Sequence, residues 1–245
     1  MPGSVYYKMA LQVTEWLSVV DECKINVSTK CISETLKEFK LESNEEFISF
    51  DVSSLYTNVP VQEAISDCSE LLYSGKYTKP PVDEDTFKQL LEICSCNVLM
   101  LTNEGYYRQK DGLAMGNPPA PLLDNCWMSK FDKKIQGDAK MYFRYMDDIL
   151  RDIRRHDIKD KVLEINELHP SLKFTHECET NSSIAFLNMM MCRSEGELTW
   201  TWHTKPTDTG LTINYHALAP QEYKIKRSAI CGLVHRIHRA CSTFS

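Results

Sequence analysis

The chain has 245 residues, of which 42% are hydrophobic and 25% are charged, and its formal net charge is −6. A chain of this length and composition buries a sizeable core of its own, as ordinary globular domains do, without disulfides or structural metal. The net negative charge excludes a protein that binds nucleic acid through bulk positive charge alone, although a locally basic surface remains compatible with it.

No apolar run approaches the ~20 residues that a membrane-spanning helix needs, because the longest candidates, such as residues 97–101, have the length of a strand. The start, Met1 to Ser4, lacks a basic region followed by an apolar stretch, so no secretory signal is predicted. Ten cysteines are scattered along the chain. Without a signal for an oxidising compartment, we expect reduced thiols in an intracellular, nuclear or cytoplasmic protein that does not bind membranes.

Elements of both types are predicted along the first half of the chain. The first forty residues are predicted to be largely helical from partly amphipathic apolar spacing. Residues 47–52 (FISFDV) are rich in aromatic and branched side chains, which favours a buried strand. Next come two predicted helices, 61–73 and 83–94, and a predicted hairpin formed by 98–102 and 106–109.

The second half of the chain contains shorter elements. A Gly/Pro-rich turn at residues 116–119 leads into a predicted helix, and a long basic helix is predicted near the end. In chain order the predictions are a helix at 121–131, strands at 141–146 and 149–153, a helix at 159–168, strands at 172–175, 184–190 and 198–203, and a helix at 224–240. Because helices and strands do not alternate regularly, we expect the α+β class with an antiparallel sheet.

Two acidic features stand at predicted strand ends. Asp51 ends the first strand, and Asp147 and Asp148 are adjacent between two short apolar runs. Carboxylates held this way are costly unless a cation meets them, and Mg²⁺ prefers hard oxygen ligands. If the strands are neighbours in one sheet, Asp51 and Asp147 converge, and two metal ions can clamp a phosphoryl transfer. The alternative is that Asp147 and Asp148 form an ordinary hairpin turn, whose geometry aspartate tolerates.

Several segments resemble the motifs of reverse transcriptases, in particular those of Penelope-like retroelements, whose polymerases are relatives of telomerase. Three of them resemble the first catalytic motif, the second palm motif and the metal-binding hairpin; these are residues 50–60 (FDVSSLYTNVP), 112–121 (GLAMGNPPAP) and 144–150 (RYMDDIL). Further segments resemble later palm and primer-grip motifs and the start of the thumb; these are residues 169–175, 186–188 and 205–208 and the terminal basic helix. Several motifs in the family's order are more specific than any one of them.

The resemblance implies a right-hand polymerase palm with an antiparallel sheet, partial fingers and a helical start of the thumb. Residues 1–190 would form the partial fingers and palm, and residues 191–245 the primer grip and the start of the thumb. The implied activity is an RNA-directed DNA polymerase that adds dNTPs to the 3′-hydroxyl of a DNA primer on an RNA template. Two Mg²⁺ ions, for which Mn²⁺ can substitute, would be held by Asp51, Val52, Asp147 and Asp148, with Asp148 assisting.

For nucleotide binding, the resemblance implies roles for four residues. Tyr56 matches the steric gate against a 2′-hydroxyl, and its alternative is an ordinary core aromatic. Met115 and Gly116 match the turn that faces the nucleotide, although a glycine in a turn needs no substrate to explain it. Lys173 matches the lysine proposed to protonate pyrophosphate, and the alternative is a solvated strand lysine.

For nucleic-acid binding, the resemblance places Phe186 and Leu187 in the primer grip, and either could instead be core. Lys205, Arg236 and Arg239 would contact phosphates of the primer–template duplex without reading its sequence. The alternative for the terminal helix is a solvated basic surface. Cysteines and histidines at 231, 235, 238 and 241 share one helical face, but along three turns they span too far to surround one zinc ion.

The chain also departs from the family pattern. The two fingers motifs expected before Asp51 are not recognisable, and no GIY-YIG endonuclease follows the thumb segment. Asn188 stands where the family has Asp, and Asp124 and Cys126 occupy helix positions where smaller or less polar residues are expected. These departures suggest a truncated copy, with an inactive remnant that at most binds nucleic acid as the alternative function. In a third reading the matches are accidental within an α+β scaffold, and Asp51 then has no carboxylate neighbour.

Overall fold

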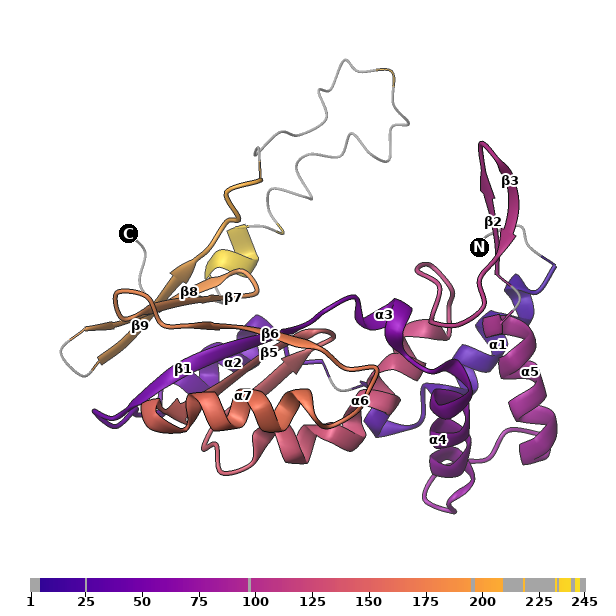
Figure 1. Cartoon of the computed structure of the whole chain (residues 1–245), viewed down its shortest axis with the longest axis horizontal. Coiled ribbons are helices and arrows are strands. Elements are labelled where there is room, and N and C mark those ends of the chain that lie inside the picture. The colour runs from indigo at the N-terminus through magenta and orange to yellow at the C-terminus, as the bar shows by residue number, and fades with distance from the viewer. Residues whose placement is uncertain are drawn as a thin grey trace.

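A computed structural model of the chain is drawn in Figure 1 and describes residues 5–24, 26–96, 98–194, 197–208, 218, 232, 234–238 and 241–242. The helices are α1 (Tyr7–Leu17), η1 (Asp21–Lys24), α2 (Thr29–Leu36), α3 (Leu55–Asn58), α4 (Val61–Tyr73), α5 (Glu84–Cys96), α6 (Ala120–Gln136), η2 (Arg155–Asp157) and α7 (Ile158–Asn166). The strands are β1 (Glu45–Val52), β2 (Leu99–Thr102), β3 (Gly105–Arg108), β4 (Tyr142–Tyr145), β5 (Asp148–Arg154), β6 (Phe174–Cys178), β7 (Ser183–Phe186), β8 (Met189–Ser194) and β9 (Glu197–Trp202).

A four-stranded sheet with the order β4-β5-β1-β6 forms the centre of the molecule. Each neighbouring pair is antiparallel, so the predicted α+β class with an antiparallel sheet is confirmed. A separate three-stranded sheet, β7-β8-β9, lies over one face of the central sheet, and α6 and α7 lie against the other (Figure 1). The β2-β3 hairpin projects from the opposite end of the molecule.

Both faces of β1 are buried over most of its length, and they enter two different cores. Ile48, Phe50 and Val52 pack into the larger core, which the helices α4, α6 and α7 also line. Phe47 points to the opposite face and packs with side chains of α2 and of the three-stranded sheet. Because side chains alternate along a strand, Asp51 shares the face of Phe47, beyond the edge of that second core, where it is exposed.

Local signals in the sequence fix several helix boundaries. The Ser28 side chain accepts a hydrogen bond from the amide of Cys31 at 3.2 Å and caps α2. Asp83 accepts one from the amide of Thr86 at 2.9 Å at the start of α5. The helix α6 begins with Pro121 in its first turn and ends at Gly137, whose φ is +53°.

Some predicted elements differ from those observed. The single strand predicted at 184–190 is wrong, because the chain turns at Leu187, where φ is +52°, and forms the β7-β8 hairpin. The one-turn helix α3 was not predicted, since four residues are too few for a periodic pattern. Residues 232 and 234–238 are helical, as expected, whereas the remainder of the predicted 224–240 helix, including Arg239, lies outside the described residues.

None of the helices described is both long enough and apolar enough to cross a bilayer.

Candidate active site

The three predicted acidic residues meet at one end of the central sheet. Asp51 in β1 stands directly opposite Asp148 in β5, as the last pair of the antiparallel register. Asp147 precedes β5 in the β4-β5 turn, and its carbonyl accepts a hydrogen bond from the amide of Val52 at 3.1 Å. Residues nearly a hundred positions apart are therefore held together by backbone pairing.

Electrostatics show how close these carboxylates are. Partial burial, followed by the charge of Asp147, raises the pKa of Asp51 above its usual value, while Lys205 opposes the rise. Burial and the charges of Asp147 and Asp51 raise the pKa of Asp148 to about 6. Hard oxygen donors that repel one another at one point suit a divalent cation, which relieves the repulsion.

The carboxylates nevertheless do not form a closed cage. In the described part of the chain, only one set of three metal-ligating side chains has all its ligand atoms within 4.8 Å of one another. That set consists of cysteines. The side chains of Asp51, Asp147 and Asp148 are therefore more open than that set. The donor types fit a hard divalent cation, and because none of the three side chains is fully buried, rotation of the carboxylates can bring them together around it.

The turn that carries Asp147 and Asp148 is fixed by a contact from the N-terminal segment. Met146 has a φ of +54°, a left-handed conformation that is uncommon for residues other than glycine. Its amide donates a hydrogen bond to the side-chain oxygen of Asn26 at 2.9 Å, and Asn26 also bridges to Tyr145. The hydrogen bond to Asn26 therefore stabilises the left-handed conformation of Met146, the residue that directly precedes Asp147.

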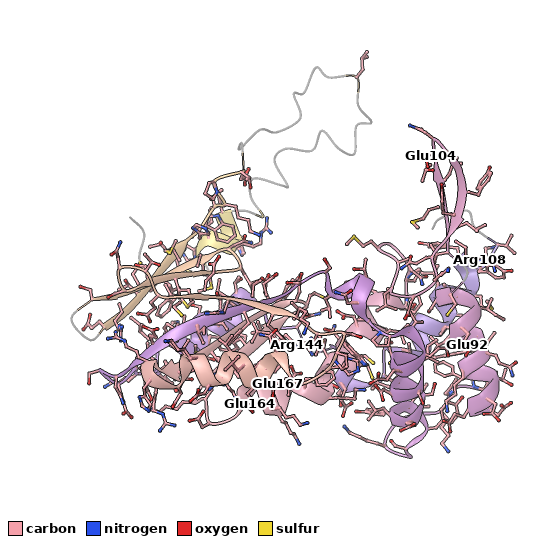
Figure 2. All side chains as sticks on the ribbon, in the orientation of Figure 1. Glu92, Glu104, Arg108, Arg144, Glu164 and Glu167 are labelled. Atoms are coloured by element: carbon pink, nitrogen blue, oxygen red, sulfur yellow. The ribbon has the colours of Figure 1, made fainter. Side chains whose placement is uncertain are left out.

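Beneath the turn lies Arg144, which is 2% exposed and is labelled in Figure 2. Its guanidinium donates two hydrogen bonds to the carboxylate of Asp132 in α6, at 2.8 and 3.0 Å. A third bond reaches the side-chain oxygen of Asn125 at 3.0 Å, and the carbonyl of Met146 lies 3.5 Å from the same guanidinium nitrogen. Bidentate pairing of this kind gives Arg144 a single orientation, so α6 supports the turn from below.

A buried acid, Asp124, lies nearby on α6. It is 0% exposed, and neither carboxylate oxygen has a hydrogen-bond partner. Burial raises the pKa of Asp124 to about 7, with Arg144 lowering it and Asp147 raising it further. Its charge also raises the pKa of Tyr56.

The loop at 112–121 packs directly against the segment that follows β1. The amide of Leu113 donates to the carbonyl of Tyr56 at 2.6 Å. At Gly112, whose φ is +81°, an added Cβ would stand 2.6 Å from the carbonyl oxygen of Thr57. A glycine is therefore required at this contact, where two backbones touch.

Tyr56 is half-buried against the larger core, and burial raises the pKa of its hydroxyl to about 12, with Asp124, Asp147 and Tyr145 adding to the rise. The ring thus lies beside the acidic cluster. Met115 is 79% exposed, and the Cβ position of Gly116 has no atom within 4 Å. These two residues border open space, and the close backbone approach in this loop occurs at Gly112 instead.

A cleft of about 380 Å³ adjoins the acids. Its lining includes the acids Asp51 and Asp148, together with Phe186, Leu187 and Lys205. Phe186 is itself a core residue at 3% exposure, whereas Leu187 occupies the left-handed turn between β7 and β8. The ammonium of Lys205 lowers the pKa of both acids, so a predicted phosphate-binding residue faces the acidic cluster.

The remaining predicted site residues are Lys173, Val52 and Arg236. The carbonyl of Lys173 accepts a hydrogen bond from the amide of Ser53 at 2.8 Å, so this lysine adjoins the end of β1 with its side chain exposed. Val52 is buried at 1% exposure, and only its backbone could reach an ion. Arg236 is exposed on the short helical stretch near the end of the chain.

Residues 11–168 match the family described as "Reverse transcriptase (RNA-dependent DNA polymerase)". The chain belongs to the reverse transcriptase family. The matched span contains all three acidic residues and the loop at 112–121. No curated protein matches the sequence.

Solved structures share the fold of this reverse transcriptase domain. Telomerase from Candida albicans, in complex with a TWJ fragment of telomeric RNA, matches with a TM-score of 0.61 and 13% identity over 94% of this chain and 42% of that one. Apo telomerase from Candida tropicalis, truncated from its C-terminal domain, matches with a TM-score of 0.56 and 14% identity over 78% of this chain and 44% of that one. The RNA-dependent RNA polymerase of BmCPV at its elongation state matches with a TM-score of 0.53 and 13% identity over 84% of this chain and 21% of that one.

These matches show a right-hand polymerase fold, as expected from the motifs. The domain spans less than half the length of each of these structures.

Several residues of the candidate site were not predicted from sequence. Asn26 carries no recognisable motif, because its role depends on a bridge to Tyr145 across more than a hundred residues. Asp132 is an ordinary polar position of a helix until Arg144 is seen to bind it. His176 and His203 line the cleft beside the acids, and neither belongs to a segment with a distinctive spacing.

Proposed function

We propose that this chain is the palm-centred polymerase module of a Penelope-like retroelement and extends a DNA primer with dNTPs on an RNA template. The observation that supports this most is the register pair Asp51–Asp148, with Asp147 at the adjoining turn. Family membership gives the reaction class, nucleotidyl transfer by a reverse transcriptase. The motif order along the chain supports the narrower retroelement assignment.

In this proposal Asp51, Asp147, Asp148 and the carbonyl of Val52 hold two Mg²⁺ ions, or Mn²⁺ in their place. When bound, such ions lower the pKa of the attacking 3′-hydroxyl and neutralise the charge that develops on the phosphates. The protein supplies the fixed positions, since β-sheet pairing places Asp51 and Asp148, and Asn26 and Arg144 hold the turn of Asp147. The raised pKa values of Asp51 and Asp148 come from burial and from neighbouring like charges, and a bound divalent cation would relieve that repulsion.

The proposed substrate roles come from the family motifs. The Tyr56 ring, beside Asp147, would exclude a nucleotide with a 2′-hydroxyl, and Met115 and Gly116 border the space that the base would enter. Lys173 would donate a proton to the leaving pyrophosphate. Leu187 at the β7-β8 turn would position the primer end.

Nucleic-acid contacts complete the proposal. Phe186 supports the primer-gripping turn from the core, and Lys205 would bind a primer phosphate across the cleft from the acids. Arg236, which is exposed, and Arg239 would contact backbone phosphates of the duplex, so that binding weakens as salt concentration rises.

Primer extension on an RNA template tests the assignment. The wild-type chain should extend a DNA primer with dNTPs and Mg²⁺, and Asp147→Asn or Asp51→Asn should lower the rate more than about 100-fold, because metal ions supply several kcal/mol of transition-state stabilisation. Asp160→Asn, an exposed acid on α7, is the matched control and should extend normally. Equal rates in wild type and both active-site variants would contradict the assignment, and so would a wild-type chain that extends no primer.

The steric-gate role is tested separately by a matched pair of substitutions. Tyr56→Ala removes the ring and should raise incorporation of ribonucleotides relative to deoxynucleotides by at least about tenfold, the effect of ~1.4 kcal/mol. Tyr56→Phe keeps the ring, removes only the hydroxyl and should preserve the preference. A Tyr56→Ala variant that still rejects ribonucleotides would show that the ring belongs only to the core.

A further inference from the structure

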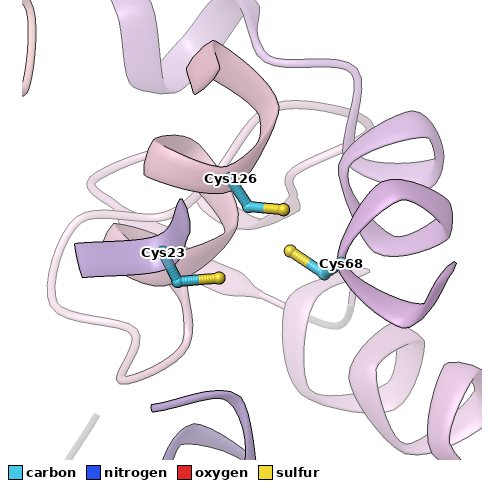
Figure 3. A group of neighbouring side chains, drawn as sticks. All are labelled: Cys23, Cys68 and Cys126. Atoms are coloured by element: carbon cyan, nitrogen blue, oxygen red, sulfur yellow. The ribbon is translucent and has the colours of Figure 1, made fainter. Parts of the chain in front are cut away.

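Three cysteines from distant parts of the chain meet inside the protein. Cys23 belongs to η1, Cys68 to α4 and Cys126 to α6. Their Sγ atoms all lie within 4.8 Å of one another. Figure 3 shows the three sulfur atoms pointing toward a common centre. Each of the three helices contributes one thiol to this contact, where a small apolar side chain would also fit.

The cluster is sealed from solvent. Cys23, Cys68 and Cys126 are each 0% exposed within the larger core. Burial raises the pKa of Cys68 far above its ordinary value, and hydrogen bonding to Cys23 together with burial raises the pKa of Cys126. Neutral thiols in such a place behave as small apolar side chains. A thiophilic ion favours the deprotonated thiolates instead, because sulfur–metal bonds replace the S–H bonds.

The spacing matches what three sulfurs need around one ion. A metal–sulfur bond of about 2.3 Å, as for zinc, places three sulfurs about 4 Å apart in a trigonal arrangement. Sulfur atoms already within 4.8 Å need only small rotations or shifts to reach that separation. Helices packed in a core can make such shifts without losing their contacts.

The set of donors selects the kind of ion. No fourth His, Cys, Asp or Glu in the described residues brings a ligand atom into the same close group. A structural zinc ion takes four protein ligands, one more than this group offers. Soft thiolate ligands favour Cu(I), which is stable with three sulfur ligands.

We propose that Cys23, Cys68 and Cys126 form a structural three-sulfur site for a thiophilic metal ion, with Cu(I) as the ion that the donor set fits best. Each thiol that ligates forms one sulfur–copper bond and releases its proton to solvent, and copper keeps its oxidation state throughout. Binding therefore weakens as the pH falls.

The site would tie together the elements that support the catalytic turn. The carbonyl of Cys23 accepts a hydrogen bond from the side-chain amide of Asn125 at 3.3 Å. The side-chain oxygen of Asn125 in turn accepts from Arg144, whose guanidinium also lies 3.5 Å from the carbonyl of Met146. An ion that joins η1, α4 and α6 would therefore stabilise the folded state around this network.

The test is an anaerobic titration of the reduced full chain with Cu(I) against a coloured competing chelator. We expect one tightly bound ion per chain and an X-ray absorption spectrum with a first shell of three sulfur atoms. Cys23→Ala, Cys68→Ala and Cys126→Ala should each weaken binding by more than about 100-fold, beyond the effect of losing an outer contact to a metal ligand. Cys94→Ala, which removes a buried cysteine of α5, is the matched control and should bind as wild type does.

Circular dichroism shows whether each cysteine variant folds. If one does not, the X-ray absorption spectrum of the wild-type chain still tests the proposal. A first shell that contains nitrogen or oxygen would overturn the proposal. Wild-type affinity in well-folded variants of all three cysteines would overturn it as well, and so would loss of the tight site in Cys94→Ala. Zinc titrated alone serves as the comparison ion and should bind more weakly than Cu(I), because three sulfurs leave its fourth position unfilled.

Discussion

The side chain of Asn26 accepts a hydrogen bond from the amide of Met146 at 2.9 Å and so joins the N-terminal segment to the turn that carries the paired aspartates. Met146 has a left-handed φ of +54°, and for an L residue this conformation is unfavourable by roughly 1–2 kcal/mol. The bond from Asn26 offsets part of that strain. The geometry of the turn that carries Asp147 and Asp148 thus depends on a residue 120 positions away.

We expect Asn26→Ala to lower the free energy of unfolding by about 0.5–1.5 kcal/mol, because the amide of Met146 loses its hydrogen-bond acceptor. Primer extension should slow as Asp147 becomes less well placed. Met146→Gly relieves the left-handed strain, so in urea denaturation the double variant should be more stable than the sum of the two single changes predicts. If the two substitutions simply add, the strain and the Asn26 contact are not coupled.

Arg144→Lys should destabilise the protein by about 3 kcal/mol, because a lysine cannot reproduce the two bonds to Asp132 and leaves buried partners unpaired. The matched control is Arg154→Lys, at an ion pair whose arginine side chain is 49% exposed. That change should cost less than about 1 kcal/mol. Chemical denaturation measures both, and similar losses would mean that the buried network adds nothing special.

Two glycines of one loop form a matched pair. Gly112 and Gly116 have nearly equal φ values, +81° and +82°, so alanine suffers the same backbone strain at either position. Only at Gly112 would the new Cβ meet a neighbour, the Thr57 carbonyl oxygen at 2.6 Å. We expect Gly112→Ala to lower the melting temperature clearly more than Gly116→Ala. Gly116→Ala should act on the Michaelis constant for dNTPs, and equal melting temperatures would contradict the contact at Gly112.

Asp124→Asn should stabilise the protein, and the gain should depend on pH. Burial raises the pKa of Asp124 in the folded chain from its ordinary 3.8 to about 7. Below both values Asp124 is protonated whether folded or unfolded, and its titration has no effect on stability. As the pH rises from 3.8 toward 7, the unfolded chain loses this proton first, so wild-type stability falls progressively and then levels off.

The difference between Asp124→Asn and wild type should therefore grow to roughly 2–4 kcal/mol near pH 7. Urea denaturation across this range measures it. Asp160→Asn, an exposed acid of α7, should show no such growth. A flat difference for Asp124→Asn would mean that the Asp124 carboxyl ionises as readily in the folded protein as in water.

Divalent metal binding should weaken below about pH 6. The pKa of Asp148 is raised to about 6 by burial and by Asp147 and Asp51. A metal ion must displace the proton of Asp148 below that value, so Mn²⁺ affinity should fall on the order of tenfold per pH unit. Asp51→Asn removes one like charge and should move the onset to lower pH while weakening binding overall. Electron paramagnetic resonance of Mn²⁺ measures both, and an affinity that is flat across this range would contradict the assignment.

The sequence by itself determined the class of the fold and most of its elements. The helix predicted at 61–73 is α4 residue for residue, and the strand predicted at 47–52 is contained in β1, because periodic apolar spacing and caps are local properties. Motif order also singled out Asp51 and the Asp147–Asp148 pair as one site. The error at 184–190 arose because apolar residues continue through the β7-β8 turn, and no glycine or asparagine marks the left-handed Leu187.

Only the tertiary structure decided which residues touch. Asn26 and Arg144 support the turn of Asp147 and Asp148 through contacts with distant parts of the chain, and a spacing rule cannot reveal them. The meeting of Cys23, Cys68 and Cys126 is of the same kind, since ten scattered cysteines predict no pairing. Local sequence determines how each segment folds, whereas the packing of segments against a shared core determines which side chains become neighbours.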